Sequence, residues 1–592
     1  MISKIKNNPV IYLTEKLWRF SYGNKKNVIL YFLMFIVANC IAFIEPLVIG
    51  RMLNFIQENG ITSSNFLSLL FYLGIILLID IGFWLFHGPA RVIETRNAFL
   101  VRANYKKYLI DGTTNLPIEW HADHHSGDTI DKIEKGTTYL YRYSESTFQI
   151  IEAIIRLISS YIVLTYFNLQ SGYIVLFVVI FTFFIISQFD KVLVKQYKAL
   201  YGAENKISEK IFDVISNITT VIILRIEKLV ASSIYKKIME PFALFCKNIN
   251  INEAKWCLVS ICSTLMTIFV LGSYFYSNIN GVILIGTIYT LYSYCQRITD
   301  QFFRFAWMYG DILRQKAAVM NAEEVAKNFK DINKVEQISI DSNWNELKIS
   351  DLTFSYHDAK NDTHLDEISL TIKRGQRIAL IGDSGSGKTT FLKIIRELYI
   401  PRKGKIYLDN KLLKNGFSAI SSDIALIPQD PEIFSTTIKE NITVGIDHKA
   451  SYIKRFTDMA CFTDVIEKLP NKIESYIFEK GVNLSGGERQ RLALSRGLMA
   501  CEDKSIVLLD EPTSSVDTKN EAIIFQNIFK EFKNKTIIAS VHRLHLLSMF
   551  DQIYFFRSGK IIVSGNLKEL LGVSKEFKDI WDKYIKLGEV DE

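Results

Sequence analysis

The chain has 592 residues, of which 49% are hydrophobic, 13% aromatic and only 22% charged, and its mean hydropathy is +0.14. Disordered, collagen-like and disulfide-stapled secreted chains are poor in large apolar residues or crowded with cysteine, so this composition excludes them. The net charge of +8 suits a nucleic-acid binder, but it also suits a membrane protein with Lys and Arg in its cytoplasmic loops. We interpret the chain as a membrane region joined to a soluble part.

The first candidate membrane span is the apolar run 28–50, which follows a polar leader, 1–27. An α-helix of about 20 residues crosses the roughly 30 Å of hydrocarbon in a bilayer. A signal peptide is the alternative, but this apolar run is too long and no A-x-A-like cleavage site follows it. We therefore predict a transmembrane helix here.

Five further apolar runs bring the predicted number of spans to six. The third of the six spans, 149–168, is the weakest, because it contains Glu152 and Arg156. Ionisable groups in lipid are costly unless they face a bundle interior or a wet cavity. We expect the membrane domain to cover residues 28–317. The five further runs are 66–87, 149–168, 171–189, 256–276 and 281–301.

The distribution of positive charge predicts the orientation. The leader and the long segments 89–147 and 190–255 are rich in Lys and Arg, whereas the short connections after the third and fifth spans carry no charge. The positive-inside rule places the charged segments in the cytoplasm. Six spans return the chain to that side, so both termini are predicted to be cytoplasmic.

The two long loops contain few turn signals and many helix-forming residues. We predict that they extend the membrane helices beyond the bilayer and touch a cytoplasmic domain at their tips, near 114–121 and 212–222. The first tip is followed by a dense polar cluster, His121, Asp123, His124 and His125. Its spacing fits no familiar zinc pattern, so a packed cytoplasmic loop and a metal site are both left open, with the loop preferred.

The soluble half is expected to start after a charged connector, 318–345, and to cover 346–592. Short β-type runs lead to RIALIG, which is followed at once by a glycine-rich turn and a helical pattern. Residues 382–389 read GDSGSGKT and fit the P-loop pattern G-x-x-x-x-G-K-[ST] without mismatch. Such a loop wraps backbone N–H groups around phosphate, while Lys388 supplies a cation and Thr389 a hydroxyl for Mg²⁺.

Two further motifs support the P-loop. The apolar run SIVLL ends in Asp510 and Glu511, which are placed to hold Mg²⁺ and to polarise an attacking water. The segment LSGGE, which begins at Leu484, runs into a helical pattern, and a Ser-Gly-Gly turn at a helix start offers a second anion site.

These motifs together resemble an ATP-binding cassette (ABC) transporter of the exporter type, a half-transporter. The resemblance covers about residues 20–585. It implies an all-α bundle of six transmembrane helices followed by an α/β P-loop NTPase domain with an antiparallel β subdomain and a helical subdomain. In that family ATP binds between the P-loop of one subunit and the signature motif of the other, so one copy of each implies a dimer, with itself or with a related half-transporter.

The resemblance also assigns further residues. It implies that Tyr356 stacks on adenine, that Gln429 reaches Mg²⁺ and the water, and that Asp517 communicates between the two sites. It gives His542 a contact with the γ-phosphate. The implied catalytic residues are Glu511, His542, Gln429 and Lys388; the implied metal ligands are Thr389, Gln429 and Asp510; the implied nucleotide-binding residues are Tyr356, Gly382, Asp383, Ser384, Gly385, Ser386, Gly387, Lys388, Thr389, Thr390, Ser485, Gly486, Gly487, Glu488 and Asp517.

Two departures from the family pattern are visible. The loop before the signature reads Phe478-Glu479-Lys480-Gly481 where the family usually has Gly-Glu-Arg-Gly, and the aspartate loop reads SSVD where the family usually has a small residue followed by Ala-Leu-Asp. Neither removes a catalytic group. We therefore expect the protein to hydrolyse ATP with Mg²⁺.

The expected function is ATP-driven export or lipid flipping of an unidentified, amphipathic or lipid-like substrate, in the plasma (inner) membrane of a bacterium and without nucleic acid as a partner. An uptake transporter and an ATP-gated channel or regulator are the alternatives. Polar groups in the spans, Asp80 and Glu45, are read first as helix-packing residues and second as substrate contacts. Five tyrosines of the last two spans are read as a substrate path, with an interfacial aromatic belt as the alternative for the first two: Tyr274, Tyr276, Tyr289, Tyr292 and Tyr294.

Overall fold

The computed structural model of the chain describes residues 8–124, 126–331, 338–341, 343–356, 364–430, 432–478 and 484–588. The chain folds into two compact units. Unit 1 comprises Met1–Leu116 and His124–Asp331, and unit 2 comprises Pro117–Asp123 and Ile332–Glu592. The short helix α6 (Ile118–Asp123), which overlaps the predicted tip of the first long loop, is therefore part of unit 2.

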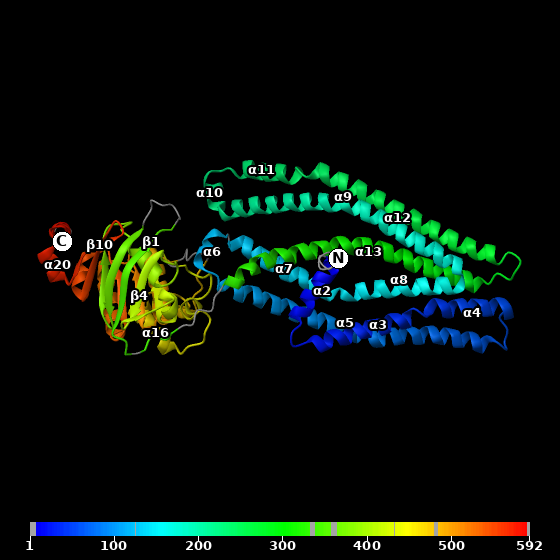
Figure 1. The fold of residues 1–592 in the computed structure, drawn as a ribbon, viewed down its shortest axis with the longest axis horizontal. Helices are drawn as coiled ribbons and strands as arrows, with labels where there is room; N and C mark the ends of the chain where they lie inside the picture. The colour runs from blue at the N-terminus through cyan, green and yellow to red at the C-terminus, as the bar shows by residue number, and fades with distance from the viewer. Residues whose placement is uncertain are drawn as a thin grey trace. The chain divides into compact units, whose positions relative to one another are not determined.

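Unit 1 is helical, and several of its helices run side by side over most of its length (Figure 1). The apolar run 66–87 and the charged segment after it lie on one helix of 49 residues, about 73 Å long at 1.5 Å per residue. The helices are α2 (Pro9–Phe20), α3 (Lys25–Ala42), α4 (Glu45–Asn59), α5 (Phe66–Thr114), α7 (Ser126–Glu145), α8 (Thr147–Phe167), α9 (Leu169–Ser216), α10 (Ile218–Ile223), α11 (Glu227–Met239), α12 (Phe242–Ser277) and α13 (Ile285–Lys327).

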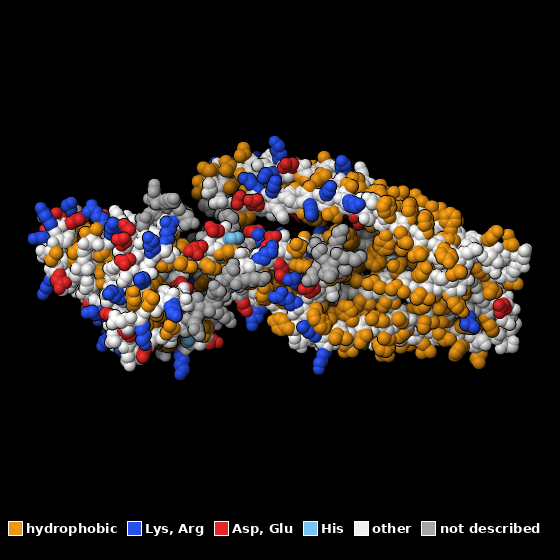
Figure 2. Space-filling view, in the orientation of Figure 1, with side chains coloured by type: hydrophobic (Ala, Val, Ile, Leu, Met, Phe, Trp, Pro, Cys, Tyr) orange, Lys and Arg blue, Asp and Glu red, His pale blue; other side chains and the backbone are white. Residues whose placement is uncertain are grey.

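Part of the surface of unit 1 is covered by hydrophobic side chains. Hydrophobic side chains cover it around α3, α4 and α8, whereas Lys, Arg, Asp and Glu gather over the rest (Figure 2). The predicted sixth span lies on α13, which is not among the five helical stretches of the described chain that are long and apolar enough to cross a membrane. Those five are Lys25–Asn59, Phe66–Thr114, Ser126–Phe167, Leu169–Ser216 and Glu227–Ser277.

Two boundaries in unit 1 differ from a simple reading of the apolar runs. The run 28–50 is divided between α3 and α4, and Pro46 lies in the first turn of α4. Proline has no backbone N–H to donate and therefore begins a helix more readily than it continues one. The segment predicted as a connector also begins as helix, because α13 continues to Lys327.

Two hydrophobic clusters stabilise unit 1, and α13 contributes to both. One cluster includes Tyr31, Tyr105 and Val319, and the other includes Val175, Met266 and Phe302. At the crossing of α4 and α13, a Cβ added to Gly286 would lie 1.8 Å from the backbone oxygen of Gly50. Small residues permit this close approach of helices.

Unit 2 contains two sheets. An antiparallel sheet has the strand order β2-β1-β4-β5, and a six-stranded sheet has the order β10-β9-β3-β8-β7-β6. The strands are β1 (Glu346–Phe354), β2 (Leu365–Lys373), β3 (Arg377–Ile381), β4 (Lys403–Leu408), β5 (Lys411–Leu412), β6 (Ile424–Ile427), β7 (Ile506–Asp510), β8 (Thr536–Ser540), β9 (Gln552–Arg557) and β10 (Lys560–Gly565).

The helices of unit 2 follow or connect these strands. They are α14 (Lys388–Ile395), α15 (Ile438–Thr443), α16 (Ala450–Met459), α17 (Thr463–Lys468), α18 (Gly486–Ala500), α19 (Thr518–Glu531), α20 (Leu567–Val573) and α21 (Lys575–Gly588). Strands β6, β7, β8, β3 and β9 are mutually parallel. All residues of β7 and β8 are buried, as expected for central strands of a parallel sheet, which read as continuous apolar runs.

Candidate nucleotide site

Four neighbouring parallel strands carry the P-loop and the predicted catalytic residues at their carboxyl ends. The P-loop follows β3, Gln429 follows β6, and His542 follows β8. Asp510 is the last residue of β7, and Glu511 comes next. Because the carboxyl ends of parallel strands meet at one edge of a sheet, these segments form a crevice of the kind in which α/β proteins bind ligands.

The P-loop backbone needs its glycines. Gly382 has φ +144°, and a Cβ there would lie 2.1 Å from the backbone oxygen of Phe556. Lys388 donates hydrogen bonds from Nζ to the backbone oxygens of Gly382, at 2.7 Å, and Asp383, at 3.0 Å. Burial lowers the pKa of Lys388, and the nearby carboxylates of the site oppose that shift. The loop therefore positions the ammonium group of the buried Lys388 among its backbone N–H groups, which suits a phosphate ligand.

A hydroxyl and a carboxylate meet where Mg²⁺ would bind. Thr389 donates from Oγ1 to Oδ1 of Asp510 at 2.9 Å. Asp510 is 2% exposed, and burial raises the pKa of its carboxyl group. Ser386 in the P-loop has a buried Oγ with no hydrogen-bond partner among the described residues. Oxygen ligands of this kind fit Mg²⁺, which takes one or two carboxylates together with substrate phosphates.

Glu511 is held between two other predicted site residues. Gln429 donates from Nε2 to Oε2 of Glu511 at 2.6 Å, and Nε2 of His542 lies 2.5 Å from Oε1. The backbone of Glu511 has φ +46°, a conformation that costs free energy for a non-glycine residue and is typical of functional sites. The structure thus brings together three of the four residues that the family resemblance implies are catalytic.

Tyr356 lies beside the P-loop helix. Its hydroxyl is 3.1 Å from Oγ1 of Thr390, and its ring makes edge-on contacts with Phe354, His364 and Tyr399. The stacking of Tyr356 on adenine stays a prediction.

The signature residues form the start of α18. Ser485 is the N-cap of α18 and forms a capping box with Glu488. The hydrogen bond from the backbone N–H of Ser485 lowers the pKa of Glu488. Asp517 caps α19 in the same way by accepting from the N–H of Asn520. Among the described residues, no hydrogen bond joins Ser485 or Asp517 to the P-loop.

Two site residues were missed by the sequence analysis. Gln490 in α18 accepts at 2.7 Å from the backbone N–H of Ser515 and donates at 3.2 Å to the backbone oxygen of Glu511. Glu521 in α19 is 5% exposed; it accepts from Oγ1 of Thr513 at 2.6 Å and from Arg543 at 3.0 Å. Glu521 therefore ties the loop after Glu511 to the loop that carries His542.

We predict that Glu521 acts as a positioning residue. Glu521→Gln keeps the size of the side chain and removes its charge, so the ion pair with Arg543 is lost. We expect kcat for ATP hydrolysis to fall about tenfold, the usual scale for losing a charge-assisted hydrogen bond, with the KM for ATP changing less than about threefold. Steady-state kinetics of Glu531→Gln, on the exposed part of the same helix, provide the control. A loss of ATP binding at unchanged kcat would contradict the prediction.

Two predicted features lie partly outside the described residues. In the loop before the signature, Phe478 is described, whereas 479–483 are not. In the polar cluster after the first loop tip, His125 lies outside the described residues. The part of the chain that the structure describes contains no group of three His, Cys, Asp or Glu residues placed to hold a metal ion.

Comparisons with known families agree with this geometry. Residues 365–514 match the family described as ABC transporter, and residues 28–300 match the family described as ABC transporter transmembrane region. The chain belongs to the ABC transporters. It is an exporter-type half-transporter, with one multi-pass membrane region and one ABC ATPase domain, so the predicted family and domain order are confirmed.

Among solved structures, the chain resembles a bacterial Atm1-family ABC exporter with ATP bound, with a TM-score of 0.80 at 19% identity over 94% of this chain and 99% of that chain. That similarity confirms the predicted fold class.

Curated relatives share the family. They include multidrug resistance protein 1 of Entamoeba histolytica, 30% identical over 64% of this chain and 30% of the relative. They also include the mitochondrial iron-sulfur clusters transporter atm1 of Aspergillus fumigatus, 31% identical over 45% of this chain and 36% of the relative. In each case, the match spans only about a third of the relative's length.

Proposed function

We propose that two copies of this chain form an ATP-driven exporter or flippase for an amphipathic or lipid-like substrate. The observation that carries the proposal is the convergence of Lys388, Asp510 and Glu511 at one sheet edge, in a chain that also has a multi-pass membrane region. A P-loop with a strand-end carboxylate pair is the arrangement used for phosphoryl transfer. In this chain it is joined to the membrane region, which would move the substrate.

Each residue has a specific role in the proposed hydrolysis. Lys388 neutralises the β and γ phosphates, and Glu511 accepts a proton from the attacking water, which Gln429 and His542 help to orient. Mg²⁺, held by Thr389, Asp510 and Gln429, would neutralise charge on the phosphate oxygens. Catalysis of this type depends mainly on positioning and electrostatic stabilisation.

The proposal requires a second copy because the site of one chain is incomplete. The N-terminus of α18, with Ser485 and Gly486, offers a helix start that favours anions, yet it is not joined to the P-loop within the described chain. We infer that it faces the nucleotide bound by the other copy. Closure of this composite site would then drive the change in the membrane region. We expect the protein to function in the plasma membrane of a bacterium.

Vesicles reconstituted with the purified protein test the proposal. With the ATPase domain outside, Mg²⁺ and ATP should move a fluorescent phospholipid or amphiphile from the outer leaflet to the inner leaflet or the lumen, and Glu511→Gln vesicles should not. ATP-dependent movement out of the vesicles would indicate an uptake transporter. Ion conductance without amphiphile movement would indicate a channel. Either result would contradict the proposed export.

A further inference from the structure

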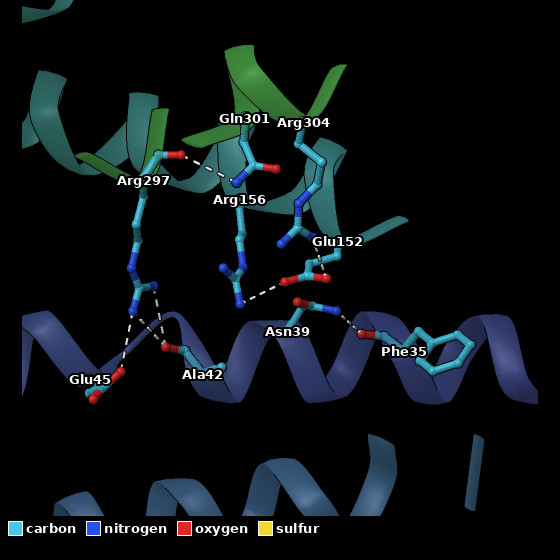
Figure 3. A network of polar contacts seen from close by, with 9 residues as sticks. All are labelled: Phe35, Asn39, Ala42, Glu45, Glu152, Arg156, Arg297, Gln301 and Arg304. Carbon is cyan, nitrogen blue, oxygen red and sulfur yellow. Dashed lines mark hydrogen bonds and ion pairs between the residues drawn. The ribbon is translucent and has the colours of Figure 1, made fainter. Parts of the chain in front are cut away.

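A network of charged residues lies between three helices of the membrane region (Figure 3). Glu152 on α8 accepts from Arg156, one turn further along α8, and from Arg304 on α13, both at 2.7 Å. Arg297 on α13 lies 3.3 Å from the carboxylate of Glu45 at the start of α4 and at 3.3 Å and 3.4 Å from the backbone oxygen of Ala42. Residues from α4, α8 and α13 therefore meet in one polar cluster.

The three arginines of the network lie at different distances along their helices. Arg297 is 12 residues from the start of α13 and Arg304 is 19, which correspond to about 18 Å and 28 Å along the helix. Arg156 is 11 residues from the end of α8, or about 16 Å. These helix ends lie at the same end of unit 1 (Figure 1). A hydrocarbon layer about 30 Å thick that began at these helix ends would hold Arg156 and Arg297 near its middle and Arg304 close to its far boundary.

The charges of the network do not balance. Three guanidinium groups share two carboxylates, and Glu152 serves two of them. Arg156 and Arg304 are each joined to Glu152 by a single short contact, although a guanidinium group has five N–H donors. Their side chains are 31% and 33% exposed in the single chain, so they remain accessible to a further acceptor.

Neighbouring amide groups are also incompletely satisfied. Gln301 is fully buried and Asn39 is 4% exposed. Each donates to a backbone oxygen of its own helix, and each leaves its side-chain oxygen without a partner among the described residues. A purely structural polar network in an apolar setting is stabilising only when its members are satisfied. Both unpartnered atoms are acceptors, so they leave room for a donor such as a water or a ligand hydroxyl, and the case for an anion rests on the guanidinium groups alone.

Asp300 is the acidic residue whose position matters most for the net charge of the network. It lies between Arg297 and Arg304 on α13, is exposed, and makes no ion pair among the described residues. It therefore does not neutralise the excess guanidinium charge through any direct contact, although it would favour a cationic ligand on the open face of α13.

We propose that Arg156, Arg297 and Arg304 bind the acidic group of the transported substrate, a carboxylate, sulfate or phosphate ester attached to an apolar tail. Guanidinium groups form charge-assisted, bidentate hydrogen bonds with such anions. The apolar tail comes from the proposed function, in which the substrate is amphipathic or lipid-like. Ionisable residues within a membrane commonly mark the path of a substrate. The inference rests on the proposed function and specifies its substrate class.

The test uses the full-length protein in phosphatidylcholine nanodiscs, with dodecyl phosphate, dodecylammonium and inorganic phosphate as probes of ATPase activity. We expect dodecyl phosphate alone to change the ATPase rate. Arg156→Gln and Arg297→Gln should raise its half-effective concentration at least about tenfold, and Arg297→Lys should raise it less. Arg51→Gln, an exposed arginine of α4 outside the network, is the matched control and should leave that concentration unchanged.

Three outcomes would contradict all or part of the proposal. A response to dodecylammonium that is lost in Asp300→Asn would overturn the proposal in favour of a cation, and an equal response to inorganic phosphate would overturn the requirement for a tail. Unshifted dodecyl phosphate curves in both glutamine variants would also overturn it. If Arg156→Gln or Arg297→Gln aggregates in size-exclusion chromatography, it is replaced by the lysine variant at the same position, which retains the charge. Absence of any basal ATPase activity that depends on Glu511 would count against the proposed function instead.

Discussion

Glu511→Gln is expected to lower ATP turnover by at least about a hundredfold while leaving ATP binding intact. The substitution keeps the shape of the side chain and its contact with Gln429, but it removes the carboxylate that accepts the proton of the attacking water. Removal of a general base typically costs 10²–10⁴ in rate. Steady-state phosphate release measures the turnover, and equilibrium binding of a fluorescent ATP analogue measures the affinity.

A matched control separates this effect from a general loss of charge. Glu440 is exposed near the start of α15, and Glu440→Gln should retain the turnover of the unmodified protein. Turnover above about a tenth of that value in Glu511→Gln would mean that another group accepts the proton. A parallel loss of ATP binding would mean that Glu511 holds the nucleotide and has no specific role in the chemical step.

Ser485→Arg is expected to abolish ATP hydrolysis without preventing ATP from binding to the P-loop. A large cation at the N-cap of α18 removes the capping hydroxyl and occupies the space where phosphate would approach the helix start. The loss of one pre-positioned donor to a transition-state oxygen costs about 10²–10³ in kcat, and the added bulk increases that loss. Phosphate release and binding of an ATP analogue to the same sample give the two quantities.

The control for the signature variant is an arginine placed elsewhere on the same unit. Ser564 lies exposed on β10, and Ser564→Arg should hydrolyse ATP at the normal rate. Melting curves with and without Mg²⁺ and ATP show whether Ser485→Arg remains folded and still binds nucleotide. Normal hydrolysis by folded Ser485→Arg would contradict a role for the signature in the site.

The nucleotide domain was largely predictable because its chemistry is local in sequence. The P-loop needs glycines at fixed positions beside Lys388, and the buried run before Asp510 marks the central strand. Gln429 and His542 were assigned by the family resemblance, and the structure places both of them beside Glu511. By contrast, Glu521 was missed, since an acid in a helix gives no signal until tertiary folding pairs it with Arg543.

The membrane region was less predictable because its polar pairings join residues that are far apart in sequence. Apolar runs gave the existence of helices, but the break between α3 and α4 depends on where Pro46 begins a new helix. Glu152 was recognised as unusual in a span, yet its partner Arg304 is 152 residues away. Arg297 and Glu45 are 252 residues apart. Such pairings depend on helix packing, which hydropathy alone does not specify.

The most direct measurement is the ATPase activity of mixed dimers that combine Lys388→Ala with Ser485→Arg, isolated with a different affinity tag on each copy. Each variant alone should be inactive. In the mixed dimer, one of the two composite sites keeps an intact P-loop from one copy and an intact signature from the other, so close to half of the normal activity should return. Continued inactivity of a folded, ATP-binding mixed dimer would contradict the shared nucleotide site on which the account depends.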